Sequence, residues 1–151
     1  YNVIVIYMDR ELKRTIILEN YQHPKNRGLV DDKEYIKINT NSDSCIDEID
    51  LMIKIKDGVI NDIRFDGEAC AICTSSTSIM INNLLGKKID EAQDIIHNFE
   101  NMINEEEYDS DKLKEAIVYD DIAKQPNRKK CALLTWQGMD KVLRRSDSNE
   151  K

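Results

Sequence analysis

The dipeptide Asp57-Gly58 constrains this chain most, because it joins two segments whose residues suit strands. Asp-Gly between such segments is a strong sequence signal for a two-residue β-hairpin. Residues 49–56 alternate apolar and polar side chains, and residues 59–65 are rich in β-branched and apolar types. A third alternating segment, residues 34–40, precedes them. The sequence therefore predicts an antiparallel sheet of about three strands.

Most of the remaining chain has apolar residues at helical spacing. The segments expected to be amphipathic helices are residues 9–19, residues 89–104 and the residues that follow Cys131. Another helix is expected from Cys73 to a stop at Gly86, with small and hydroxyl side chains in its first turn. Residues 111–123 form a more polar candidate helix. Because strands come first and helices after, the sequence predicts an α+β fold with several helices packed on the sheet.

With 151 residues, 40% of them hydrophobic, the chain can bury one core, so we expect a single domain over residues 8–145 with tails at 1–7 and 146–151. The net charge of -7 argues against nucleic-acid binding, which needs a basic face. The apolar run at residues 3–7 is far shorter than the roughly 20 residues of a membrane span, and it does not have the pattern of a signal peptide. We therefore expect no membrane association. Four cysteines without an export signal predict reduced thiols and a cytoplasmic location.

Three of the four cysteines fall at junctions between predicted elements. Cys45 precedes a strand, Cys70 lies between a strand and a helix, and Cys131 stands at the start of the last helix. Junctions can aim side chains into a common pocket. Asp47 lies two residues after Cys45, on the same side of an extended chain. Zinc accepts cysteine sulfur and aspartate oxygen in a tetrahedral set, so these four residues form a candidate metal site.

Alternatives to a metal site remain open at the level of single residues. Any one cysteine taken alone can equally be interpreted as a small buried hydrophobe. The spacing of Cys70 and Cys73 is shared by redox pairs and by halves of zinc sites. We interpret Cys73 mainly as a small residue at a helix start. His23 precedes a proline in a loop and His97 lies off the apolar stripe of its helix, so both are expected at the solvated surface.

Four segments, in the right order, resemble the SufU/IscU family, which is related to the N-terminal domain of NifU. The family's Tyr-x-x-Pro-x-Asn-x-Gly segment is matched by YQHPKNRG at 21–28, its Asn-Pro-x-Cys-Gly-Asp loop by NSDSCID at 41–47, its Phe-x-Gly-x-Gly-Cys-x-Ile junction by FDGEACAI at 65–72, and its Pro-x-Arg-x-Lys-Cys-Ala-x-Leu segment by QPNRKKCALL at 125–134. The resemblance covers residues 9 to about 143, and it implies a SufE/NifU-like fold.

The resemblance is closest to the SufU-type branch. Lys130, and not histidine, precedes Cys131, and residues 105–124 supply the longer insertion of that branch. Ile46 and Ala69 depart from the family pattern because they stand where glycine is usual. Residues other than glycine adopt positive φ only at an energetic cost. The way in which Asp47 approaches the metal site can therefore differ from that of the family.

The resemblance implies a zinc-bound acceptor of persulfide sulfur from a SufS-like or IscS-like cysteine desulfurase, with cluster assembly or carrier proteins downstream. Cys45 is the expected acceptor, beside Asp47 as an exchangeable oxygen ligand, while Cys70 and Cys131 remain on the metal. One alternative is a scaffold that assembles and donates a [2Fe-2S] cluster on the same thiolates. Another is a small structural zinc module that only binds partners.

A basic run, Arg128-Lys129-Lys130, immediately precedes Cys131. Three thiolates and a carboxylate around a divalent ion carry a net negative charge that is costly to desolvate. We expect these cations to offset that charge. The simpler interpretation is a solvated loop, because charge runs usually face water.

Overall fold

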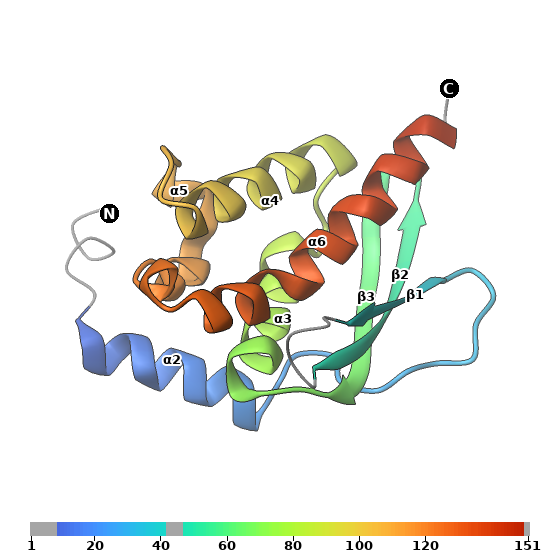
Figure 1. Cartoon of the computed structure of the whole chain (residues 1–151). Coiled ribbons are helices and arrows are strands. Elements are labelled where there is room, and N and C mark those ends of the chain that lie inside the picture. The colour runs from blue at the N-terminus through green and yellow to red at the C-terminus, as the bar shows by residue number, and fades with distance from the viewer. Residues whose placement is uncertain (1–8, 42–46, 150–151) are drawn as a thin grey trace.

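The computed structural model describes residues 9–41 and 47–149, the last four of these by backbone alone, and it has the predicted α+β fold. Its sheet has three antiparallel strands in the order β1-β2-β3. The strands are β1 (Ile36–Asn41), β2 (Glu48–Lys56) and β3 (Val59–Glu68). Figure 1 shows this sheet on the right, with α6 crossing in front of it and α2, α4 and α5 on the left.

The hairpin predicted from Asp57-Gly58 is confirmed. Both residues have positive φ, 54° and 75°, as a two-residue turn of the favoured primed type requires. The turn sets the register so that Ile49, Leu51 and Ile53 of β2 all lie on the core side and are at most 1% exposed. The alternation seen in the sequence is therefore the inward face of the central strand.

Strand β3 contains an irregularity that the sequence did not predict. Lys54 pairs with Asp62, whereas the next residue, Ile55, pairs with Ile60. One extra residue therefore bulges from β3, which lets Ile60 and Ile63 both reach the core although they are three positions apart.

The longer helices are α2 (Arg10–Gln22), α3 (Ala71–Leu84), α4 (Ile89–Ile103) and α6 (Pro126–Asn149). Helix α2 ends two residues before Pro24, as expected from the restriction that proline places on its predecessor. Helix α3 is central, since it contacts α2, α6 and β3. It thereby joins the helical layer to the strand that precedes it.

The single helix expected over residues 111–123 was wrong. This stretch instead forms three short elements: α5 (Ser110–Leu113), η1 (Lys114–Tyr119) and η2 (Ile122–Lys124). Lys114 has a φ of 50° and a ψ of -124°, which no regular right-handed helix can contain. The apolar residues still reach the core, but they do so from successive turns.

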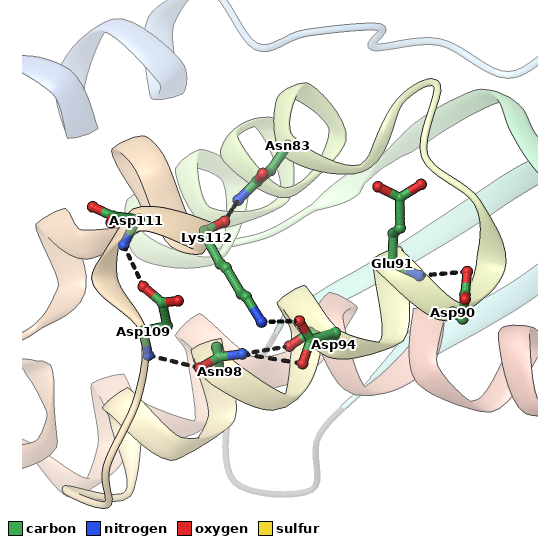
Figure 2. A network of polar contacts seen from close by, with 8 residues as sticks. All are labelled: Asn83, Asp90, Glu91, Asp94, Asn98, Asp109, Asp111 and Lys112. Carbon is green, nitrogen blue, oxygen red and sulfur yellow. Dashed lines mark hydrogen bonds and ion pairs between the residues drawn. The ribbon is translucent and has the colours of Figure 1, made fainter.

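Polar contacts fix α5 and the residue before it to α4 and α3 (Figure 2). Lys112 forms an ion pair with Asp94 at 2.5 Å, and the Asn98 side chain accepts a hydrogen bond from the backbone N–H of Asp109. Asn83 on α3 donates to the carbonyl of Leu113. The segment is thus held by two helices through side-chain contacts.

Helix α6 is longer at both ends than the sequence suggested. It begins at Pro126, because proline suits a first helical position, so Cys131 lies in the second turn and not at the start. It continues through residues 146–149, which we expected in a frayed tail, since neither glycine nor proline follows Gly138. Gly138 itself lets the helix approach β1, where an added Cβ would lie 2.6 Å from Thr40 Cγ2.

An aromatic cluster fills the space between α4, η1 and α6. The rings of Phe99 and Trp136 stack with centroids 3.9 Å apart, and Tyr119 meets Phe99 edge-on at 6.2 Å. All three side chains are at most 1% exposed. Within the described residues, none of the helices combines the length and the apolar character that a membrane span requires.

Candidate metal centre

Asp47 lies immediately before β2 and is only 1% exposed. Its carboxylate contacts the junction between β3 and α3: Oδ1 accepts a hydrogen bond from the backbone N–H of Cys70 at 2.6 Å, and Oδ2 lies 3.3 Å from the Cys70 thiol. The start of one strand is thereby tied to the end of the next. A buried carboxylate so placed is available as an oxygen ligand.

Cys70 is the N-cap of α3, with extended backbone and a sulfur that accepts a hydrogen bond from the Cys73 N–H at 3.4 Å. Three residues earlier, Gly67 has a φ of 140° and pairs with Ile49. A Cβ on Gly67 would lie 2.2 Å from the carbonyl oxygen of Glu48. The two strands therefore come close because a glycine stands there, and this brings Cys70 to Asp47.

Cys131 reaches the same place from α6 and is 8% exposed. The candidate ligand atoms of Asp47, Cys70 and Cys131 all lie within 4.8 Å of one another. Helix α6 is anchored here by Ser76 of α3, whose hydroxyl donates to the carbonyl of Ala132 at 2.7 Å. Sulfurs on a tetrahedral zinc at about 2.3 Å lie about 3.8 Å apart, so this donor set fits zinc after small side-chain movements.

The electrostatics of the cluster favour a cation. Partial burial, and then the Asp47 carboxylate, raise the pKa of the Cys70 thiol, although the Cys73 N–H opposes this shift. Burial also raises the pKa of the Cys131 thiol, and Asp47 and Cys70 add to the increase. Without a cation, both thiols keep their protons at neutral pH. A divalent ion reverses this balance, because it favours the thiolate forms.

The structure brings together three of the four residues that the sequence singled out, namely Asp47, Cys70 and Cys131. Cys45 lies outside the described residues, so its place in the cluster stays a prediction. The three described cysteines are free thiols. Cys73 is fully buried in α3, where its carbonyl accepts a hydrogen bond from the Thr77 hydroxyl.

The two histidines are exposed, as expected: His23 follows α2, and His97 lies within α4. The basic run before Cys131 forms the first turns of α6, not a loop. Its first member, Arg128, lines a cavity of about 410 Å³ together with Arg10 and Arg14 of α2. Compensation of the charge of the cluster by this run stays a prediction.

Sequence reasoning missed two residues that position the centre. Gly67 sets the strand approach described above, and the only sequence signal was its place in the matched junction motif. Tyr119 hydrogen-bonds with Ser75 of α3, the helix that Cys70 caps. Burial raises the pKa of Tyr119 far above its ordinary value, so the phenol stays neutral. No local pattern predicts that contact.

An α+β protein with two thiols and a buried carboxylate converging at a strand-to-helix junction is, by its chemistry, a protein equipped to bind a soft or borderline metal. Comparison of the sequence with known protein families identifies the family. The chain belongs to the NifU-like N terminal domain family, which its sequence matches over residues 12–132.

Individual relatives agree with this assignment. The chain is 36% identical over 129 residues to the iron-sulfur cluster assembly scaffold protein IscU of Thermotoga maritima, covering 85% of this chain and 90% of that protein. It is 32% identical over 137 residues to the zinc-dependent sulfurtransferase SufU of Bacillus subtilis, covering 90% and 92%. The crystal structure of a SUF-system scaffold protein (FiSufU) from Fervidobacterium islandicum superposes with a TM-score of 0.76 at 32% identity, covering 81% and 89%.

Proposed function

We propose that this protein acts in iron-sulfur cluster assembly as a zinc-bound acceptor that takes sulfur from a cysteine desulfurase and passes it to downstream assembly or carrier proteins. The observation that carries the proposal is the convergence of Asp47, Cys70 and Cys131 on one point. Similarity to a relative named as a zinc-dependent sulfurtransferase supports it. We place the activity in the cytoplasm, where free thiols persist.

Four residues have distinct roles in this proposal. Cys70 and Cys131 are held by the start of α3 and the second turn of α6, so they serve as fixed ligands. Asp47 supplies an oxygen ligand. Cys45 supplies the nucleophile, because it stands two residues from Asp47 in a polar stretch of sequence. Bound zinc would hold the cysteine sulfurs deprotonated and ordered until the desulfurase arrives.

The transfer step is a thiol exchange. The Cys45 thiolate attacks the terminal sulfur of a cysteine persulfide on the desulfurase. The sulfur–sulfur bond of that persulfide breaks and a new one forms on Cys45, while the desulfurase cysteine leaves as a thiolate. One sulfane sulfur moves and no net oxidation occurs, so no further reactant is required.

A second candidate function is a scaffold on which a [2Fe-2S] cluster is assembled and then donated. The observation that favours it is the 36% identity to a relative named as a cluster assembly scaffold. Thiolates are the usual ligands of such clusters, and the same residues would hold one. Metal content separates the two functions. A colourless protein with about one zinc that accelerates a desulfurase supports transfer, whereas a visible-absorbing iron species after reconstitution supports the scaffold.

The test compares Asp47→Ala with Cys73→Ser. Cys73 serves as the control because it is a nearby buried cysteine that is not among the three converging residues. Loss of a ligand should weaken zinc retention by at least about tenfold, as even supporting residues of metal sites do when removed. Metal analysis of protein purified without added metal measures retention. Sulfide release by a cysteine desulfurase, with alkylation and mass analysis of the acceptor, measures transfer.

Two results would overturn the assignment. If Cys73→Ser lost more zinc or more transfer than Asp47→Ala, the oxygen ligand would be wrongly chosen. If Cys45→Ala left desulfurase stimulation and persulfide labelling unchanged, the protein would be a structural zinc module instead of a sulfur acceptor.

A further inference from the structure

A second group of metal-ligating side chains lies between α4 and α6, away from the thiols. His97 and Glu100 are three residues apart on one face of α4, and Asp140 meets them from α6. One nitrogen and two oxygens from these residues all lie within 4.8 Å of one another. Asp140 follows Cys131 by nine residues in the same helix, roughly 13 Å along its axis. The two groups are therefore separate.

The carboxylates of this second group are partly withdrawn from water. Asp140 is 6% exposed and Glu100 is half-buried. Burial first, and then the charge of Asp140, raise the pKa of Glu100, while His97 and Arg144 oppose this shift. Two carboxyl groups thus share a site where negative charge is costly, so a cation placed between them would be stabilised.

The cation that now faces this group is weakly fixed. Arg144 pairs with Asp140 at 2.5 Å one helical turn further along α6, and its side chain is 67% exposed. The arginine side chain can turn toward solvent, where its charge stays hydrated, but the buried Asp140 carboxylate then needs another cation. A metal ion could therefore take its place without disturbing the helix packing.

We propose that His97, Glu100 and Asp140 bind one divalent transition-metal ion of intermediate or hard character, with water in the remaining positions. One imidazole and two carboxylates suit Mn²⁺, Fe²⁺ or Zn²⁺ but offer no thiolate. Ligand atoms on one such ion lie about 3 to 4 Å apart, so the group needs to close by at most about 1 to 2 Å. His97 is exposed and free to make that movement by rotation of its side chain.

Mn²⁺ is the probe, because it prefers oxygen and nitrogen ligands and leaves a zinc-loaded thiolate site undisturbed. Full-length zinc-loaded protein is titrated with Mn²⁺ while the signal of free Mn²⁺ is followed by electron paramagnetic resonance. We expect one equivalent to bind per chain, with affinity at least tenfold lower in His97→Ala and in Glu100→Gln. Asp90→Asn, an exposed carboxylate on the same helix, is the matched control and should bind as the wild type does.

A second readout uses the fact that the chain has only two histidines. Substoichiometric Mn²⁺ should broaden the imidazole proton resonances of His97 and leave those of His23 sharp. Arg144→Ala should bind Mn²⁺ severalfold more tightly, because it removes the competing cation. A group that is only a structural ion pair would not gain affinity.

The proposal fails if no stoichiometric Mn²⁺ binding is seen in the wild type, if Asp90→Asn weakens binding as much as His97→Ala, or if both histidines broaden equally. Circular dichroism of each variant confirms that it is folded before its affinity is used. No desulfurase enters these measurements, so their outcome is independent of the sulfur-transfer function proposed above.

Discussion

Replacing Gly67 with alanine tests whether a close strand approach assembles the candidate metal centre. Gly67 has a φ of 140°, a backbone conformation that residues other than glycine rarely adopt. Its added Cβ would lie 2.2 Å from the Glu48 carbonyl oxygen and 3.0 Å from Ile49 Cα. Both neighbours are backbone atoms, so no side chain can rotate away to make room. The start of β2 must therefore move, and it carries Asp47 with it.

The cost follows from two terms. Holding a non-glycine residue in such a backbone conformation costs about 1 to 3 kcal/mol. Moving β2 away from β3 also weakens the terminal strand pairing, at about 1 kcal/mol for each hydrogen bond lost. With one or two hydrogen bonds lost, we expect Gly67→Ala to lower the free energy of unfolding by about 2 to 5 kcal/mol, which is large for one methyl group.

Gly58→Ala is the control for the conformational term alone. Gly58 also has positive φ, 75°, but nothing lies within 4 Å of its added Cβ. Alanine there should cost about 1 to 2 kcal/mol. Urea unfolding followed by circular dichroism compares the two variants, and zinc retention is measured on the folded fraction. Equal losses of stability in both variants, or full zinc retention in Gly67→Ala, would refute the reasoning.

Two further predictions concern the core beneath the centre. Ser76→Ala removes the acceptor of the buried Trp136 indole N–H, which lies 2.9 Å away. It should lower the free energy of unfolding in urea by about 1 to 3 kcal/mol. If the effects of Ser76→Ala and Trp136→Phe were fully additive in the double variant, the two side chains would not be coupled and the prediction would be wrong. Burial raises the pKa of Tyr119 in the folded protein. The folded protein therefore keeps a phenol proton that the unfolded chain loses above about pH 10. The free energy of unfolding should fall as the pH rises from about 10 toward the folded pKa. Wild type should then lose up to about 1.4 kcal/mol more per pH unit than Tyr119→Phe, and parallel stability profiles from pH 9 to 11 would disprove it.

The sequence predicted those parts of the fold that local rules control. The hairpin at Asp57-Gly58 needed only the turn residues and the alternation on both sides. Helix α4 (Ile89–Ile103) was found within one residue because its apolar stripe is regular. The short turns after α5 were missed because positive φ at Lys114, a residue with no turn preference, depends on packing that the local sequence does not encode.

Helix α3 shows a different limit. Its Thr-Ser-rich start predicted cappers of a first turn, but residues 74–78 are all buried in the middle of the helical layer. Four of these hydroxyls bond to distant elements: Ser75 to Tyr119, Ser76 to Ala132 and Trp136, Thr77 to Thr135, and Ser78 to Asn20. These partners are 44 to 60 residues away in the sequence, so composition alone identifies small residues but not their tertiary contacts.

The candidate site was predictable as a set of residues and not as a geometry. Thiols at predicted junctions and a carboxylate two residues from a cysteine suggested the ligands. That the carboxylate accepts the N–H at the N-cap of α3 follows only from the strand approach at Gly67, which no spacing rule contains. The proposal for Cys45 therefore rests on the sequence, and that for Asp47, Cys70 and Cys131 on the structure as well.

The structure also bears on whether a metal is needed for folding. Small zinc modules fold only with their ion because they bury too little apolar surface. Here the core is formed mainly by apolar side chains, among them the aromatic cluster of Phe99, Tyr119 and Trp136 and the inward face of β2, and Cys73 and Cys131 are its only buried cysteines among the described residues. Binding energy at the centre is thus not required to hold the helices together, which leaves a ligand free to exchange. If the protein is loaded with zinc, its removal by a chelator should accordingly preserve the helical signal in circular dichroism, a result that a purely structural zinc module would not give.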